Sequence, residues 1–126
     1  MIALSDPPVK KLILIVEDEP KIAAFMQKGL HRSGFATAVV TDGKAVISKL
    51  LDNPVDLVLL DLGLPTQDGL EVLKEMQQYQ LNLPVIVVTA RSLSSQEAQV
   101  MQMSGTEVVS KPFLMKDLVQ KVRSLV

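Results

Sequence analysis

The chain has no cysteine and no tryptophan, and its aromatic side chains are limited to three Phe and one Tyr. The absence of cysteine excludes a disulfide framework and a thiolate metal site. Hydrophobic residues nevertheless make up 48% of the 126 residues, so the core must be aliphatic, built from Val, Leu, Ile and Met. This length is sufficient for one domain with a real hydrophobic core.

Long apolar runs and an excess of one charge are also missing. Apolar runs reach about five residues, far short of the roughly 18 that a membrane-spanning helix needs, so no membrane partner is expected. The 13 basic and 14 acidic residues leave a formal charge of −1 without a basic stripe, which argues against nucleic-acid binding by this domain. The first residues lack the pattern of a secretory signal, so we expect a cytoplasmic protein.

The order of apolar and amphipathic segments predicts the fold class. Pro7 and Pro8 indicate an extended or flexible lead-in over residues 1–9. Short apolar runs then alternate with amphipathic segments, the pattern of a parallel sheet covered by helices on both faces. Strands are expected at residues 11–16, 35–40, 56–61, 85–89 and 107–110, and helices at about 20–32, 43–52, 70–78, 94–103 and 115–125. Five such β/α units favour a doubly wound α/β sheet.

Polar residues interrupt the apolar pattern at only one end of the strands. Glu17 and Asp18 follow the first strand, Asp61 ends the third, Thr89 ends the fourth and Lys111 follows the fifth. In a doubly wound sheet, ligands bind beyond the carboxyl ends of the strands, near the point where the strand order reverses. This one-sided placement therefore predicts a functional site at that edge.

The three acids indicate a cation. Carboxylates gathered at one edge repel one another unless a positive charge lies between them. Mg²⁺ suits such a site, because it binds a few carboxylates and keeps several waters and a phosphate ligand. Glu17, Asp18 and one oxygen of Asp61 could hold the ion, and the backbone carbonyl of Gly63 could be a further ligand.

The second oxygen of Asp61 could act as a nucleophile on phosphorus, with Lys111 and Thr89 facing the charge on the phosphoryl oxygens.

Each residue alone has a simpler explanation. Asp61 could be only a turn acid, Glu17 and Asp18 could serve the start of a helix, and Thr89 could reflect β-propensity. Their joint occurrence, in this order and each at the carboxyl end of a strand, favours a site.

Four segments carry a resemblance to a known family. They are Val16-Glu17-Asp18-Glu19, Leu59-Leu60-Asp61-Leu62-Gly63-Leu64-Pro65-Thr66-Gln67-Asp68-Gly69, Val87-Val88-Thr89-Ala90 and Lys111-Pro112-Phe113. Together they closely resemble the CheY-like receiver domain of bacterial two-component response regulators. The resemblance implies a flavodoxin-like fold with strand order 2-1-3-4-5 and helices on both faces, and a receiver domain at residues 10–126.

The resemblance also implies roles for the acidic residues. Asp61 matches the phosphoacceptor, which takes its phosphoryl group from a sensor histidine kinase or a phosphotransfer protein. Glu17 and Asp18 match the acid pair that binds Mg²⁺, and Gly63 matches the residue whose carbonyl completes the metal site. The pair is Glu-Asp rather than Asp-Asp, a variation that should alter the metal geometry only slightly.

Thr89 matches the switch hydroxyl of the family and Lys111 the lysine that pairs with the phosphoryl group. The bond between Lys111 and Pro112 is often cis in this family. Receiver domains usually carry Tyr or Phe three residues before the lysine, and here that position holds Val108. Because Val is small and stiff at χ1, a large ring rotation cannot be the readout of phosphorylation.

Three hypotheses about function follow. The first is a phosphorylation-dependent switch, which is not chiefly an enzyme although it promotes its own phosphorylation and dephosphorylation. The second is a haloacid-dehalogenase-like phosphatase with Asp61 as the nucleophile; Gly63 stands where that family has a second Asp, and the chain is too short for its usual fold. The third is a receiver-like interaction module that does not use phosphate, for which Val108 argues.

Many response regulators continue from the last helix into an output domain. Lys121-Val122-Arg123-Ser124-Leu125 resembles the close of receivers that precede winged-helix DNA-binding domains, as in OmpR/PhoB-type regulators. A role in transcription would then belong to that further domain. A homodimer through the fourth helix, the fifth strand and the last helix is left open.

Overall fold

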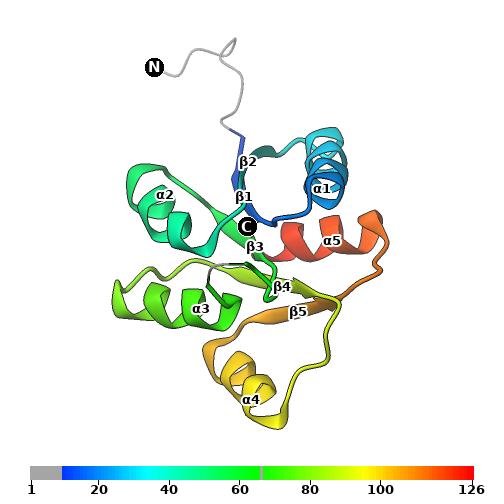
Figure 1. Ribbon diagram of the computed structural model, residues 1–126. Coiled ribbons are helices and arrows are strands. Elements are labelled where there is room, and N and C mark those ends of the chain that lie inside the picture. The colour runs from blue at the N-terminus through cyan, green and yellow to red at the C-terminus, as the bar shows by residue number, and fades with distance from the viewer. Residues whose placement is uncertain (1–9, 66) are drawn as a thin grey trace.

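A computed structural model describes residues 10–65 and 67–126, so the predicted lead-in over residues 1–9 lies outside the described residues. Parallel strands form one five-stranded sheet in the order β2-β1-β3-β4-β5 (Figure 1). The strands are β1 (Leu12–Val16), β2 (Ala36–Val40), β3 (Leu57–Leu60), β4 (Val85–Thr89) and β5 (Glu107–Ser110). The expected flavodoxin-like strand order is confirmed.

Helices cover both faces of the sheet (Figure 1). They are α1 (Pro20–Arg32), α2 (Val46–Asp52), α3 (Gly69–Gln78), α4 (Ser95–Ser104) and α5 (Met115–Leu125), with the short 3₁₀ helix η1 (Gly43–Ala45) before α2. α1 and α5 pack on one face, and α2, α3 and α4 pack on the other. Within residues 10–65 and 67–126, no helix has the length and apolar character that crossing a membrane requires.

The central strands are buried on both sides. In β1, Ile13 packs with Met26 of α1 and Leu118 of α5, whereas Leu14 faces the opposite layer with Val46 of α2. β3 and β4 are buried along their whole length. Successive side chains of a strand point to opposite faces, so two covered faces require the continuous apolar runs seen in the sequence. The polar residues that follow these strands are therefore the first to reach the edge of the core.

Local signals in the sequence explain where the helices begin and end. Pro20 is the first residue of α1, and Gly105 ends α4 with φ of 71°. Asn53, before Pro54, is extended and ends α2. The second helix differs from expectation, because its first residues form the separate turn η1. There the side chain of Asp42 accepts a hydrogen bond from the N–H of Lys44.

Candidate functional site

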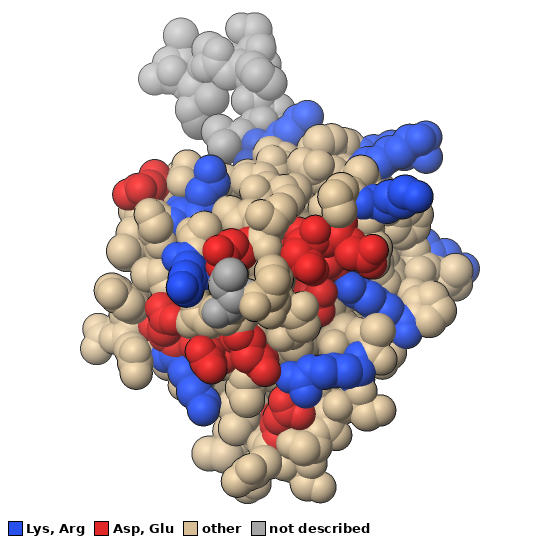
Figure 2. Space-filling model, viewed as in Figure 1, with Lys and Arg blue, Asp and Glu red and all other residues tan. Residues whose placement is uncertain are grey.

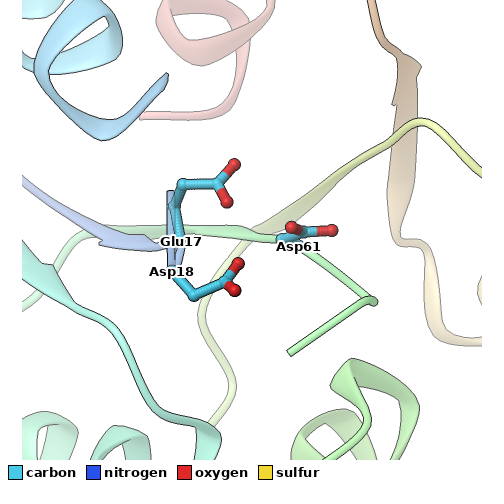
Figure 3. Close-up of side chains that lie close together, drawn as sticks. All are labelled: Glu17, Asp18 and Asp61. Atoms are coloured by element: carbon cyan, nitrogen blue, oxygen red, sulfur yellow. The ribbon is translucent and has the colours of Figure 1, made fainter. Parts of the chain in front are cut away.

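Glu17, Asp18 and Asp61 lie together at the carboxyl edge of the sheet, after the neighbouring strands β1 and β3 (Figure 3). Val16 pairs with Leu60 in the register of these strands, so the residues that follow emerge side by side. One carboxylate oxygen of each acid lies within 4.8 Å of the others. Acidic side chains gather near the centre of this face, with Lys and Arg around them (Figure 2). The structure thus brings the three predicted acids together.

Lys111 brings a positive charge to these acids. Its Nζ lies 2.7 Å from Glu17 Oε1 and 3.5 Å from Asp61 Oδ2. Burial raises the pKa of Glu17, although the hydrogen bond from Lys111 and another from the N–H of Glu19 favour the charged form. Burial alone would lower the pKa of Lys111, but the hydrogen bond to Glu17 and the charge of Asp61 raise it overall. The lysine is therefore held as a cation.

Thr89 is buried at the end of β4, at the same edge of the sheet. Its backbone carbonyl accepts a hydrogen bond from the N–H of Lys111 at 2.9 Å. Its Oγ1 accepts a hydrogen bond from the N–H of Arg91 at 3.2 Å. The Lys111–Pro112 peptide bond is cis. The two residues predicted to face a phosphoryl group are thus joined through the main chain.

The loop after β3 orients the carboxylate of Asp61. The N–H of Gly63 donates a hydrogen bond to Asp61 Oδ1 at 3.1 Å. The N–H of Gly69, the first residue of α3, donates to the carbonyl of Leu62 at 3.0 Å. A Cβ at Gly69 would lie 2.6 Å from the Asp61 carbonyl oxygen and 2.7 Å from Leu62 Cα. Glycine therefore allows α3 to begin directly against the chain that carries Asp61.

The predicted site residues line one cleft of about 300 Å³, called the acidic cleft below. Its lining consists of Glu17, Asp18, Glu19, Asp61, Gly63, Thr89, Ala90, Arg91 and Lys111. All of the residues assigned from the sequence to the metal and to the phosphoryl group are among them. Arg91, which sequence reasoning did not single out, adds a second cation to the wall of the cleft.

Arg91 connects the acidic cleft to two helices. Its Nη1 and Nη2 donate hydrogen bonds to Glu97 Oε1 at 3.1 Å and Oε2 at 2.8 Å, and Nη2 lies 3.5 Å from Asp68 Oδ1. Glu97 belongs to the capping box of α4, and Asp68 caps α3. The spacing of Ser94 and Glu97 was a readable signal for the start of α4. No local pattern assigned Arg91 to Glu97, because that pairing depends on the path of the loop after Thr89.

Val108 stands on the same face of the sheet as Thr89. It pairs with Val87 in the register of β4 and β5, and Thr89 pairs with Ser110 two residues further along. The side chain of Val108 is half-buried against the core layer of α2, α3 and α4. The position three residues before Lys111 therefore holds a small aliphatic side chain and no ring.

The donor set of the acidic cleft fits Mg²⁺. Carboxylate oxygens are hard ligands, and an open cleft leaves positions for water and phosphate. His31, the single histidine of the sequence, is exposed on α1 and lies 2.7 Å from Thr37 Oγ1 through its Nε2. It therefore contributes no nitrogen ligand, and the site is built from oxygen donors.

Comparison with known proteins gives the same fold. The chain is similar in structure to the Francisella response regulator 1452 receiver domain, with 29% identity, a TM-score of 0.83, and 92% of this chain and 96% of that chain covered. It is also similar to the response regulator TrrA of Thermotoga maritima, crystallised in complex with Mg²⁺–BeF. That likeness has 30% identity, a TM-score of 0.81, and covers 92% of this chain and 99% of TrrA.

Sequence comparison connects the chain to transcriptional regulators. It is 35% identical over 114 residues to the transcriptional regulatory protein QseB of Haemophilus influenzae, covering 90% of this chain and 52% of QseB. It is 30% identical over 117 residues to PhoP of Bacillus subtilis, the alkaline phosphatase synthesis transcriptional regulatory protein, covering 93% of this chain and 49% of PhoP. The chain thus spans about half the length of these relatives. Residues 13–123 match the response regulator receiver domain family, and the chain belongs to that family.

Proposed function

We propose that Asp61 is the residue of this receiver domain that accepts a phosphoryl group. The observation that carries the proposal is the position of Asp61 Oδ2, 3.5 Å from Lys111 Nζ and in the same cleft as Thr89. An ammonium group and a hydroxyl in this place are suited to the charge on transferred phosphoryl oxygens. Receiver domains of response regulators interact with histidine kinases or phosphotransfer proteins, and we infer the same donor classes for Asp61.

The transfer is a displacement at phosphorus. A carboxylate oxygen of Asp61 forms a bond to phosphorus, the bond between phosphorus and the donor breaks, and the leaving group keeps the electron pair. For a phosphohistidine donor, the broken bond is P–N and an imidazole leaves. Lys111 Nζ stabilises the negative charge on the phosphoryl oxygens, and the Thr89 hydroxyl donates a hydrogen bond to one of them. Water later attacks phosphorus, the bond between phosphorus and the Asp61 oxygen breaks, and inorganic phosphate leaves. The Asp61 carboxylate is thereby regenerated, so the domain would dephosphorylate itself.

We infer that Glu17, Asp18 and Asp61 hold Mg²⁺, with the backbone carbonyl of Gly63 as a further ligand. When bound, the ion would neutralise the charge that the acids and the phosphoryl oxygens accumulate. The Mg²⁺–BeF complex of the similar receiver TrrA supports this assignment. Receiver domains are generally phosphoacceptors and not enzymes. The ion would therefore assist the phosphorylation of Asp61 itself and not the turnover of a separate substrate.

We further propose that the receiver domain comprises residues 10–126 and works in the cytoplasm. Phosphorylation would shift which partner binds the face formed by α4, β5 and α5, and a second copy of the chain is one such partner. The relatives QseB and PhoP are transcriptional regulators, which supports a role in transcription. DNA binding would then belong to a domain other than this one.

Phosphorylation by acetyl phosphate, followed by intact-protein mass spectrometry, tests the proposal. The wild-type protein should gain the mass of one phosphoryl group with Mg²⁺ and none with EDTA. Asp61→Asn should gain none, whereas Asp52→Asn, which changes an exposed acid on α2, should be labelled like the wild type. Continuous release of phosphate over many turnovers would indicate a phosphatase instead. Absence of labelling would indicate an interaction module without phosphate chemistry.

A further inference from the structure

α4 is anchored to the core more weakly than the other α-helices that the structure describes. It buries only Met101, whereas α1, α2, α3 and α5 each bury three or more residues. Met103 on the same helix is 81% exposed. With so little apolar burial, the position of α4 depends strongly on the polar contacts at its first turn.

Those polar contacts converge on Glu97. The N–H of Ser94 donates to Glu97 Oε1 at 3.0 Å, and the N–H of Glu97 donates to Ser94 Oγ at 3.1 Å, which forms a capping box. The two oxygens of Glu97 also receive the two hydrogen bonds from the guanidinium of Arg91. The N-terminus of α4 is thus tied to a cation that lines the acidic cleft.

A phosphoryl group in the cleft would compete for this cation. It carries a charge of about −1.5 to −2 at neutral pH and three strong acceptor oxygens. A guanidinium binds phosphate through two parallel hydrogen bonds. The side chains of Glu97 and Asp68 are 15% and 48% exposed, so water solvates them when the guanidinium leaves. The pair of Arg91 with Asp68 is exposed and contributes little free energy. The main cost of the exchange is therefore the two hydrogen bonds to Glu97, which hydrogen bonds to the phosphoryl oxygens would replace.

We propose that Arg91 is a further ligand of the phosphoryl group and the residue through which phosphorylation alters the first turn of α4. The guanidinium leaves Glu97 and Asp68 for the phosphoryl oxygens, and the first turn of α4 loses the contact that ties it to the cleft. The inference rests on the proposed phosphorylation of Asp61. It provides a route from the acidic cleft to α4 that needs no aromatic ring at Val108.

The experiment uses fluoroberyllate with Mg²⁺ as a stable phosphoryl substitute on Asp61. Two quantities are measured for each variant: the fluoroberyllate affinity, and the amide exchange rate of Glu97 and Ala98 with and without fluoroberyllate. In the wild type, fluoroberyllate should accelerate exchange at these amides severalfold. Far-UV circular dichroism of every variant checks that the fold is kept.

The variants separate a role through Arg91 from a general effect of charge. Arg91→Gln should weaken fluoroberyllate binding about tenfold, the effect of losing a charge-assisted hydrogen bond, and its α4 amides should not respond further. Glu97→Gln should tighten binding, because Arg91 then loses its charged partner on α4 and is held less firmly away from the phosphoryl group. The double variant should bind like Arg91→Gln, since Glu97 acts through Arg91. Lys121→Gln and Glu107→Gln, which break a comparable ion pair between α5 and β5, should bind like the wild type.

Other outcomes overturn the inference. If α4 in Arg91→Gln responds to fluoroberyllate as it does in the wild type, or if Glu97→Gln still tightens binding in the Arg91→Gln background, Arg91 is not the readout. In that case labelling of Asp61 by acetyl phosphate still upholds the proposed function. If wild-type Asp61 takes neither acetyl phosphate label nor fluoroberyllate, the proposed function fails and the inference about Arg91 fails with it.

Discussion

Lys111 Nζ donates a hydrogen bond to Glu17 Oε1 at 2.7 Å, whereas Asp61 Oδ2 lies farther from the same ammonium, at 3.5 Å. The lysine is thus paired mainly with a carboxylate whose side chain is 1% exposed. Asp61, at 13% exposure, is only loosely paired with the ammonium. Lys111 therefore compensates mainly the charge of Glu17, and it remains close enough to Asp61 to contact the phosphoryl group that we propose there.

Replacing Lys111 with Met should destabilise the Mg²⁺-free protein. The change leaves Glu17 buried without a counter-charge, which should lower the free energy of unfolding by about 3 kcal/mol at neutral pH. The loss should shrink at acidic pH, where Glu17 takes a proton. Urea unfolding measures both values. Lys121→Met, which breaks the exposed pair with Glu107, should cost less than about 1 kcal/mol. Equal losses in the two variants would contradict the pairing.

Mg²⁺ should raise the thermal midpoint of the protein, because the ion binds the folded acid cluster and not the unfolded chain. At a free Mg²⁺ concentration a hundred times the dissociation constant, the free energy of unfolding should rise by about 2.7 kcal/mol. Asp18→Asn should reduce this response, and in EDTA it should be no less stable than the wild type, since it removes repulsion among the acids. Differential scanning calorimetry with and without MgCl₂ measures the effect. Asp52→Asn is the control and should keep the full rise of the thermal midpoint with Mg²⁺. If Asp18→Asn shows the same full rise, the ion binds elsewhere.

Gly69→Ala should perturb the chain that carries Asp61. Its Cβ would lie 2.6 Å and 2.7 Å from backbone atoms of Asp61 and Leu62, which cannot move aside independently. We expect a loss of about 1–3 kcal/mol in the free energy of unfolding. Gly63→Ala is the matched control for stability, because there the nearest atom to an added Cβ is Asp61 Oδ1 at 3.9 Å. Chemical denaturation that ranks the two variants equally would count against the close approach of α3.

The contact between Arg91 and Glu97 should give α4 a pH dependence. The hydrogen bonds from Arg91 hold the pKa of Glu97 below its ordinary value of 4.5. Because the folded-state pKa is depressed, the stabilisation is fully present above pH 4.5 and is lost as the pH falls through the folded-state value. Amide exchange at Ala98 should therefore accelerate in this acidic range relative to the same amide in Glu97→Gln. An identical pH profile in both proteins would show that the contact does not support the helix.

The sequence by itself determined the elements of the fold and the side of the sheet on which the site lies. Short apolar runs such as Leu57–Leu60, bounded by turn residues, predict strands covered on both faces. Pro20 and Gly105 mark helix ends through their own backbone preferences. The carboxyl-end positions of Glu17, Asp61 and the other polar residues were readable for the same reason, because an apolar run ends where the core ends. The order of the strands followed from the resemblance to receiver domains.

Only the tertiary structure decided how the charges are paired. The sequence predicts that Lys111 lies near the acids. It does not predict that Lys111 lies closer to Glu17 than to Asp61. It also leaves the partners of Arg91 undefined. The physical reason is that hydrophobic periodicity is a local property of the chain, set by residue spacing. The distance between two charges depends on loop paths and side-chain rotamers that the packed core fixes only after distant segments have met.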